Sequence, residues 1–255
     1  MTEQWRLLLT GDRSAFDNMA IDEAILRSVV ADKVPSTLRF YGWQPSAVSI
    51  GYFQGIEQEV DLAACRARGV DVIRRLTGGG AVFHDHDGEI TYSLAVKDSH
   101  PKISRKVLDS YGVLCGGLVA GFQQLGIDAA FKPINDIIVN GKKISGNAQT
   151  RRFGGVLQHG TLLCDVNPQL MFTLLKVPNE KIRDKLIQGV AERVTSIRRE
   201  LGVVDKEAVI RAMSAGFERV LGIELVPGTL SDAELALAER IKAERYATTA
   251  WNFRR

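Results

Sequence analysis

The sequence predicts a mixed α/β domain, in which strands dominate the first two thirds of the chain and helices the last third. Two patterns carry this prediction: short segments rich in β-branched and aromatic residues, and longer segments with apolar residues at helical spacing. With 255 residues, of which 45% are hydrophobic, the chain can bury one large core. We therefore expect a single domain over 1–255, with a small helical subdomain from about residue 180.

Two of the strand pairs have turn signals between them. TLRFYGW at 37–43 and AVSIGYF at 47–53 flank Pro45 and Ser46, which favours a hairpin. Within 136–144, Asn140–Gly141 separates two apolar stretches and is a strong hairpin signal. Further strands are expected at 6–9, 70–73, 89–96 and 156–166.

The helices are predicted from apolar periodicity together with residues that can cap their ends. Ser14 or Asp17 can cap the first, and the sequence SDAE from Ser231 is a capping box. Gly69 and Gly126 are natural stops after two others. The expected ranges are 14–30, 61–68, 104–125, 205–220 and 231–246.

Composition excludes several classes of function. A net charge of +3 is too mild for a nucleic-acid-binding protein. The three cysteines, Cys65, Cys115 and Cys164, form no CxxC pair and indicate neither a zinc site nor a disulfide framework. The N-terminus does not resemble a signal peptide, and no apolar run approaches the roughly 18 residues of a membrane span. We expect a cytoplasmic protein without nucleic-acid or membrane partners.

The segment RRLTGGGAVFHD at 74–85 is the strongest candidate for a ligand site. Three consecutive glycines let a ligand lie on the backbone, and successive free N–H groups can bind an anion. Arg74 and Arg75 could fork onto carboxylate or phosphate oxygens, and His84 follows on the other side. The alternative is a flexible turn flanked by surface arginines.

The hairpin at 136–144 offers a second candidate. Strand alternation would place Lys143 and Ser145 on one face and Lys142 and Ile144 on the other. An ammonium held over a pocket suits phosphate oxygens, although a Lys-Lys pair beside a turn is usually solvated.

Two further dipeptides each have two possible roles. In Asn135–Asp136 the aspartate can cap a turn or hold Mg²⁺ beside a phosphate. His159–Gly160 interrupts a strand, through packing or through a bulge that admits a ligand. Neither a P-loop nor a GxGxxG turn is present.

Taken together, these motifs resemble the lipoate–protein ligase A family of the biotin/lipoate ligase and octanoyltransferase superfamily. The resemblance rests on RRxTGGGAVFHD, ND at 135–136, KKISG at 142–146 and HGTLL at 159–163. It extends over nearly the whole chain, from FDNMAIDEA at 16–24 to AWNF at 250–253. It implies a mixed β-sheet flanked by helices, and a ligase that converts ATP and lipoate into lipoyl-adenylate. The lipoyl group then passes to a lysine of a carrier domain.

The resemblance also implies the site residues. Lys143 matches the family's essential lysine and is the expected catalytic residue. Asp136 is the candidate for Mg²⁺. The remaining ATP and lipoyl-adenylate contacts are expected from Arg74, Arg75, Thr77, Gly79, Gly80, Ala81, Val82, Phe83, His84, Asn135, Asp136, Ser145, Gly146 and His159.

Two alternatives compete with the ligase. An octanoyltransferase would move octanoate from acyl carrier protein through a cysteine thioester, and RFYGWQP at 39–45 looks close to that branch. However, that branch carries its cysteine at the place that 130–134 occupies here, and this segment has no cysteine. A second transferase branch uses a cysteine well after the HG motif, whereas Cys164 lies only four residues past Gly160. A non-catalytic carrier-domain binder could dispense with Lys143. The ligase is the favoured prediction.

The expected partners follow from the same resemblance. The carrier would be the glycine cleavage H protein or a lipoyl domain of a 2-oxoacid dehydrogenase E2. Longer ligases continue past the AWNF segment with an accessory domain, whereas this sequence stops at Arg255. We therefore expect lipoate activation to need a separate accessory subunit.

Overall fold

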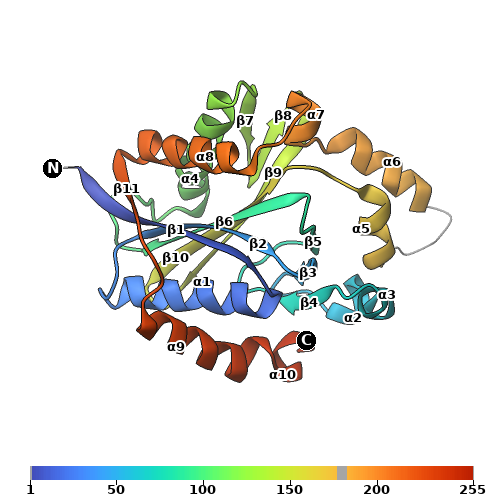
Figure 1. Cartoon of the computed structure of the whole chain (residues 1–255), viewed down its shortest axis with the longest axis horizontal. Helices are drawn as coiled ribbons and strands as arrows, with labels where there is room; N and C mark the ends of the chain where they lie inside the picture. Colours follow the sequence, from blue (N-terminus) through green and yellow to red (C-terminus); the bar gives the residue numbers. More distant parts are fainter. Residues whose placement is uncertain (1, 177–182, 255) are drawn as a thin grey trace.

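The structure, a computed structural model, describes residues 2–176 and 183–254. Its main sheet has eight strands in the order β11-β1-β2-β6-β10-β9-β8-β7 (Figure 1). Strand β1 pairs in parallel with β2 and β11, and the other pairs are antiparallel. The strands are β1 (Glu3–Arg13), β2 (Thr37–Trp43), β6 (Glu89–Lys97), β7 (Ala129–Lys132), β8 (Asp136–Val139), β9 (Lys142–Arg152), β10 (Gly155–Leu163) and β11 (Ile223–Pro227).

A second, three-stranded sheet has the order β4-β3-β5. It consists of β3 (Ala47–Ile50), β4 (Asp71–Arg74) and β5 (Val82–His84). The predicted hairpin between 37–43 and 47–53 is wrong, although both segments contain strands. Both edges of β2 are occupied by β1 and β6, so β3 has to pair elsewhere, with β4 and β5.

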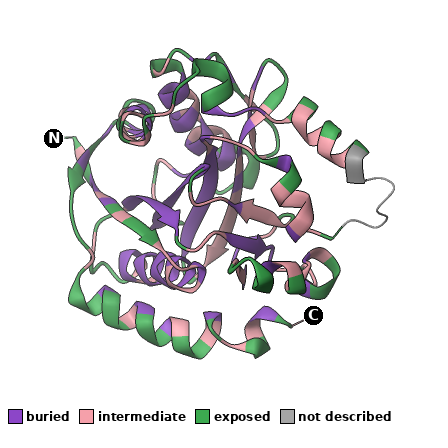
Figure 2. Cartoon of the chain, turned by 45° about the vertical axis from the view of Figure 1, so that its right-hand side comes forward, coloured by how far each residue is buried: buried purple, intermediate pink, exposed green. Residues whose placement is uncertain are grey.

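Helices cover both faces of the main sheet, as predicted. Helices α4 and α8 pack on one face, and α1 and α9 on the other (Figure 1). Purple buried strands run through the centre of Figure 2, and green exposed residues line the outer sides of the helices. The helices are α1 (Ala15–Val30), α2 (Ile56–Glu59), α3 (Leu62–Ala67), α4 (Val107–Gln124), α5 (Pro168–Leu174), α6 (Arg183–Arg193), α7 (Ile197–Leu201), α8 (Lys206–Leu221), α9 (Asp232–Ile241) and α10 (Thr249–Asn252), with a π-helical turn η2 (Lys242–Tyr246).

Glycines allow α4 and α8 to approach closely. A Cβ on Gly216 would lie 2.2 Å from the carbonyl oxygen of Gly117 and 2.5 Å from the nitrogen of Gly121. Glycine lowers helix stability by about 1 kcal/mol relative to alanine. Here its lack of a side chain lets the two backbones touch, and this contact anchors α8 to the main domain.

Local sequence signals specified several element ends correctly. Ser14 accepts a hydrogen bond from the Asp17 N–H at the start of α1, and Ser231 forms the predicted capping box. Asn140 and Gly141 have φ of 49° and 79°, as a tight turn between β8 and β9 requires. The bulge considered at 159–160 is wrong, because β10 pairs without interruption with β6 and β9 there.

The C-terminal third is tied to the main sheet by β11, which pairs with β1, and by the packing of α8 on α4. The boundary expected near residue 180 lies outside the described residues. No helix in the described part of the chain is long and apolar enough to cross a membrane.

Candidate active site

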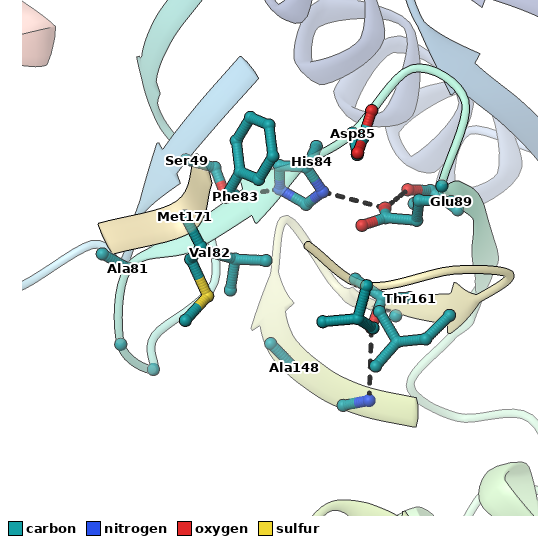
Figure 3. A pocket seen from close by; sticks show the side chains of 18 of the residues that line it. Ser49, Ala81, Val82, Phe83, His84, Asp85, Glu89, Ala148, Thr161 and Met171 are labelled. Atoms are coloured by element: carbon teal, nitrogen blue, oxygen red, sulfur yellow. Dashed lines mark hydrogen bonds and ion pairs between the residues drawn. The ribbon is translucent and has the colours of Figure 1, made fainter. Parts of the chain in front are cut away.

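A cavity of about 350 Å³ opens where the small sheet meets the ends of β6, β9 and β10 (Figure 3). Its volume falls within the usual range of small-molecule sites, and its surface is mainly apolar. The structure gathers eleven of the predicted site residues around it: Arg75, Gly79, Gly80, Ala81, Val82, Phe83, His84, Asn135, Lys143, Gly146 and His159. Four others, Arg74, Thr77, Asp136 and Ser145, do not line it.

The glycine segment forms a tight loop against the end of β3. A Cβ on Gly51 would lie 2.0 Å from the carbonyl oxygen of Gly79, and Gly79 has a φ of +97°, so neither position tolerates a side chain. The N–H groups of Gly78, Gly79 and Gly80 donate to no acceptor in the described part of the chain. They are therefore available to an anionic ligand or a developing oxyanion, and anion binding at this loop stays a prediction.

Arg75 shapes this loop from inside. Its five N–H groups donate to Thr77 Oγ1, to the carbonyl and hydroxyl oxygens of Ser49, and to the carbonyl oxygens of Gly78 and Gly80. A guanidinium has five such donors. The expectation that Arg75 forks onto a ligand is therefore not met, because the protein itself uses every donor. Burial lowers the pKa of Arg75 to about 10.

Arg74 points away from the cavity and does not act as the predicted anion ligand. Its guanidinium donates to six backbone carbonyls, at Gly51, Tyr52 and Gln54 on one side and at Trp251, Asn252 and Arg254 on the other. It thus joins the C-terminal residues to the strand that leads into the glycine loop.

Lys143 lies on β9, next to Asp136, with 2.7 Å between Nζ and Oδ1. The predicted alternation of faces is wrong here. The register skips Ile144, since Ile138 pairs with Lys143 and Ile137 with Ser145. Ile144 and Ser145 are therefore both fully buried, whereas 39% of the Lys143 side chain is exposed. This bulge turns the ammonium toward the cavity.

No cluster of metal-ligating side chains among the described residues supports the predicted Mg²⁺ site at Asp136. Its carboxylate pairs with Lys143, and the described residues contain no group of three or more His, Cys, Asp or Glu side chains that could hold a metal. Asn135, which does line the cavity, exchanges hydrogen bonds with Asn147 and fixes the start of the β8–β9 hairpin.

His84 lies between two polar side chains at the cavity wall (Figure 3). Its Nε2 is 2.8 Å from Ser49 Oγ, and its Nδ1 is 2.8 Å from Glu89 Oε1. The ring stacks on Trp43 with 4.0 Å between centroids. Thr91 donates to Glu89 and accepts from the indole N–H of Trp43. The sequence analysis missed four residues of this network, Ser49, Glu89, Thr91 and Trp43. The only signal was that Ser49 and Thr91 are polar residues within largely apolar strands.

His159 belongs to a second buried network. Its Nε2 is 2.7 Å from Thr77 Oγ1, and its Nδ1 is 3.8 Å from Asp22. Burial lowers the pKa of His159, despite the nearby carboxylate. Burial alone would raise the pKa of Asp22, but the Arg39 guanidinium at 2.7 Å and other donors lower it. The imidazole is therefore neutral and the carboxylate ionised at neutral pH.

The cysteines lie outside the cavity. Cys65, Cys115 and Cys164 are each at most 1% exposed, and none of them lines it. Burial raises the pKa of Cys65 to about 11 and those of Cys115 and Cys164 to about 12. A thiolate nucleophile requires a lowered pKa and access, and these thiols have neither. Their burial is that of cysteines packed inertly in the core.

The chain matches the lipoyl protein ligase A/B catalytic domain over residues 14–218. It is 40% identical to an octanoyltransferase LipM of Brevibacillus brevis, over 99% of this chain and 100% of that protein. It is 41% identical to an octanoyltransferase LipM of Kyrpidia tusciae, with the same coverage. Among solved structures, a bi-partite lipoate protein ligase of Thermoplasma acidophilum is 33% identical, with a TM-score of 0.89 over 98% of this chain and 96% of that one.

These relatives overturn the prediction of an ATP-dependent lipoate ligase. The two curated proteins, which match over their full length at 40% and 41% identity, are octanoyltransferases. The motifs could not separate the two activities, because the chain is similar both to octanoyltransferases and to a lipoate protein ligase. The ATP, Mg²⁺, lipoate and accessory subunit expected with the ligase stay predictions. The match to enzymes also argues against a non-catalytic binder.

Proposed function

Since the chain belongs to the lipoyl protein ligase A/B catalytic domain family, we propose that it transfers an octanoyl group to a lysine of a lipoyl carrier domain. The observation that carries the proposal is the match to octanoyltransferases at 40% and 41% identity, over 99% of this chain and the full length of those proteins. The donor would be an octanoyl thioester on acyl carrier protein.

The cavity suits an unbranched acyl chain. Met19, Val82, Phe83, Leu163 and Met171 contribute apolar side chains to its wall. Burying each methylene of the acyl chain is worth about 0.8 kcal/mol, so an apolar wall holds an octanoyl group firmly. Methionine side chains adapt to a flexible ligand because they are unbranched.

The polar end of the cavity suits acyl transfer. As the donor carbonyl becomes tetrahedral, negative charge develops on its oxygen and requires donors nearby. The Lys143 ammonium and the free N–H groups of Gly79 and Gly80 can supply them. In the net reaction the thioester C–S bond breaks, an amide C–N bond forms to the carrier lysine, and the thiol leaves with the proton of the amine.

The carrier partner and the location belong to the same proposal. The bi-partite ligase of Thermoplasma acidophilum is part of a lipoylation system together with its E2 lipoyl domain, which supports a carrier of this type. We propose a glycine cleavage H protein or a 2-oxoacid dehydrogenase lipoyl domain as the acceptor, in the cytoplasm.

Mass spectrometry of a lipoyl domain tests this function. The purified protein is incubated with the domain and either octanoyl-acyl carrier protein alone or ATP with free octanoate or lipoate. We expect one octanoyl group on the domain in the first reaction, without ATP. Labelling that occurs only in the reactions with ATP would refute the proposal.

A further inference from the structure

An acyl transferase that holds its acyl group covalently needs a nucleophile at the cavity. The three cysteines of the chain are buried outside it, so a thioester would require a large rearrangement. Among the hydroxyl groups that line the cavity, Ser49 is in direct contact with an imidazole, because its Oγ lies 2.8 Å from His84 Nε2.

Ser49, His84 and Glu89 have the arrangement of a nucleophile, a base and an orienting carboxylate. The serine hydroxyl meets Nε2 at 2.8 Å, and the carboxylate meets Nδ1 at 2.8 Å, so the ring bridges the two. All three residues line the same cavity (Figure 3). This pattern of roles recurs on unrelated folds and is recognised by geometry rather than by residue order.

The hydrogen-bond directions in this chain of residues follow from its two ends. Arg75 can only donate, so Ser49 Oγ accepts its N–H at 3.0 Å and has its own proton free for His84 Nε2. At the other end, Trp43 donates to Thr91 at 2.8 Å, and Thr91 in turn donates to Glu89. Glu89 Oε1, which accepts this hydrogen bond, then also accepts from His84 Nδ1–H. These directions leave Nε2 unprotonated and able to take the serine proton.

The second hydroxyl–imidazole pair, Thr77 with His159, does not meet the same requirements. Its carboxylate, Asp22, is 3.8 Å from Nδ1, which is too long for a hydrogen bond. Thr77 is also fully buried and does not line the cavity. The comparison singles out Ser49 as the hydroxyl that an acyl group in the cavity would meet.

We propose that Ser49 carries the octanoyl group as an ester during transfer, with His84 as general base and acid and Glu89 as its orienting partner. The proposal rests on the function proposed above. Ser49 Oγ attacks the thioester carbonyl while its proton moves to His84 Nε2. The C–S bond then breaks, and the thiolate takes that proton. In the second step the carrier amine attacks the ester, its proton passes through His84, and the C–O bond breaks to restore the serine.

The surroundings suit an ester intermediate. Ser49, His84 and Glu89 are 1%, 6% and 2% exposed, so bulk water has little access to an ester formed there. An acyl carbonyl has to enter from the cavity to reach Oγ. The free N–H groups of Gly79 and Gly80, which line the cavity, can stabilise the charge that develops on the carbonyl oxygen during attack.

The test traps the intermediate. Wild-type protein is incubated with octanoyl-acyl carrier protein in the absence of a lipoyl domain, quenched with acid, digested and analysed by mass spectrometry. We expect one octanoyl group on Ser49, stable to hydroxylamine at neutral pH, as an oxygen ester is and a thioester is not. In Ser49→Ala both this adduct and transfer to a lipoyl domain should be lost, the latter by at least about 10³-fold.

Two further variants separate catalysis from folding. Ser49→Cys should regain acylation as a hydroxylamine-sensitive thioester, which a structural role for Ser49 does not predict. Ser214→Ala is the matched control, because the Ser214 hydroxyl is buried without a hydrogen-bond partner among the described residues and lies outside the cavity.

Three results would overturn the proposal. The first is a wild-type rate of octanoyl transfer in the Ser49→Ala variant, and the second is an octanoyl group on a cysteine of the wild-type protein. The third is rapid transfer with no acylated protein, which would indicate direct attack by the carrier amine. Wild-type protein that never labels a lipoyl domain from octanoyl-acyl carrier protein would instead refute the proposed function itself.

Discussion

Gly146 lies directly beneath the side chain of Lys143. A Cβ at position 146 would fall 2.6 Å from both Cε and Nζ of that lysine. The glycine thus leaves the space in which the ammonium reaches Asp136 and the cavity, which explains why a glycine follows three residues after the lysine in KKISG.

We expect Gly146→Ala to displace the Lys143 ammonium and to lower the rate of octanoyl transfer by about 10- to 100-fold, because small misplacements of a positioned group cost that much. Rate constants for transfer to a lipoyl domain measure this. Gly112→Ala is the control, since a Cβ there would meet only Phe131 at 4.0 Å. Equal rates for the two variants would argue against the packing role of Gly146.

Lys143→Ala should abolish most of the transfer while leaving the protein folded. Removing one donor to a developing oxyanion costs about 10²–10³ in rate. The Lys143 side chain is 39% exposed, so its removal should change the melting temperature little. Lys142→Ala, one residue away, exposed and outside the cavity, should keep the wild-type rate. Near-normal activity in a folded Lys143→Ala protein contradicts the assignment.

Replacing Cys65, Cys115 and Cys164 together by alanine should leave octanoyl transfer intact. The three thiols are buried and outside the cavity, and their raised pKa values keep them protonated. Some stability will be lost, of the order of 1 kcal/mol for each small cavity created. Transfer rates at a temperature where the variant is folded decide the matter, and loss of activity there would implicate a thiol.

The stability of the protein should fall on acidification below about pH 6.5, partly because of His159. Its folded pKa lies below the ordinary 6.5, so the unfolded chain binds a proton that the folded protein does not. The lowered pKa of Asp22 adds a loss at lower pH, in the same direction. Denaturant unfolding across this range should show a weaker pH dependence for His159→Gln. An unchanged dependence would show that His159 does not contribute.

Sequence reasoning succeeded where a signal is local. The Ser14 cap, the Ser231 capping box and the Asn140–Gly141 turn each depend on residues within a few positions of one another. It failed for the pairing of β2 and β3, because the partners of a strand are chosen by the whole sheet.

The site was predicted in part for the same reason. The glycine loop and Lys143 stand in recognisable motifs, and the structure brings both to one cavity. The contact between Ser49 and His84 spans 35 positions and needs β3 beside β5, which no pattern in the sequence specifies. The roles of Arg74 and Arg75 could not be predicted either. The residue type is the same whether a guanidinium binds backbone carbonyls, as both do here, or a ligand.

The hydrogen bonds of Arg74 have a consequence for local unfolding. They unite the segment before the glycine loop with residues 178 positions away, at Asn252, through bonds to both backbone and side chain. If Trp251 and Asn252 detach, the guanidinium loses several buried acceptors at once. Because buried donors without partners cost free energy, opening of these two residues alone is disfavoured. Residues 251–254 and the segment that leads into the glycine loop therefore form one cooperative unit, whose amide protons should exchange with solvent at a common rate.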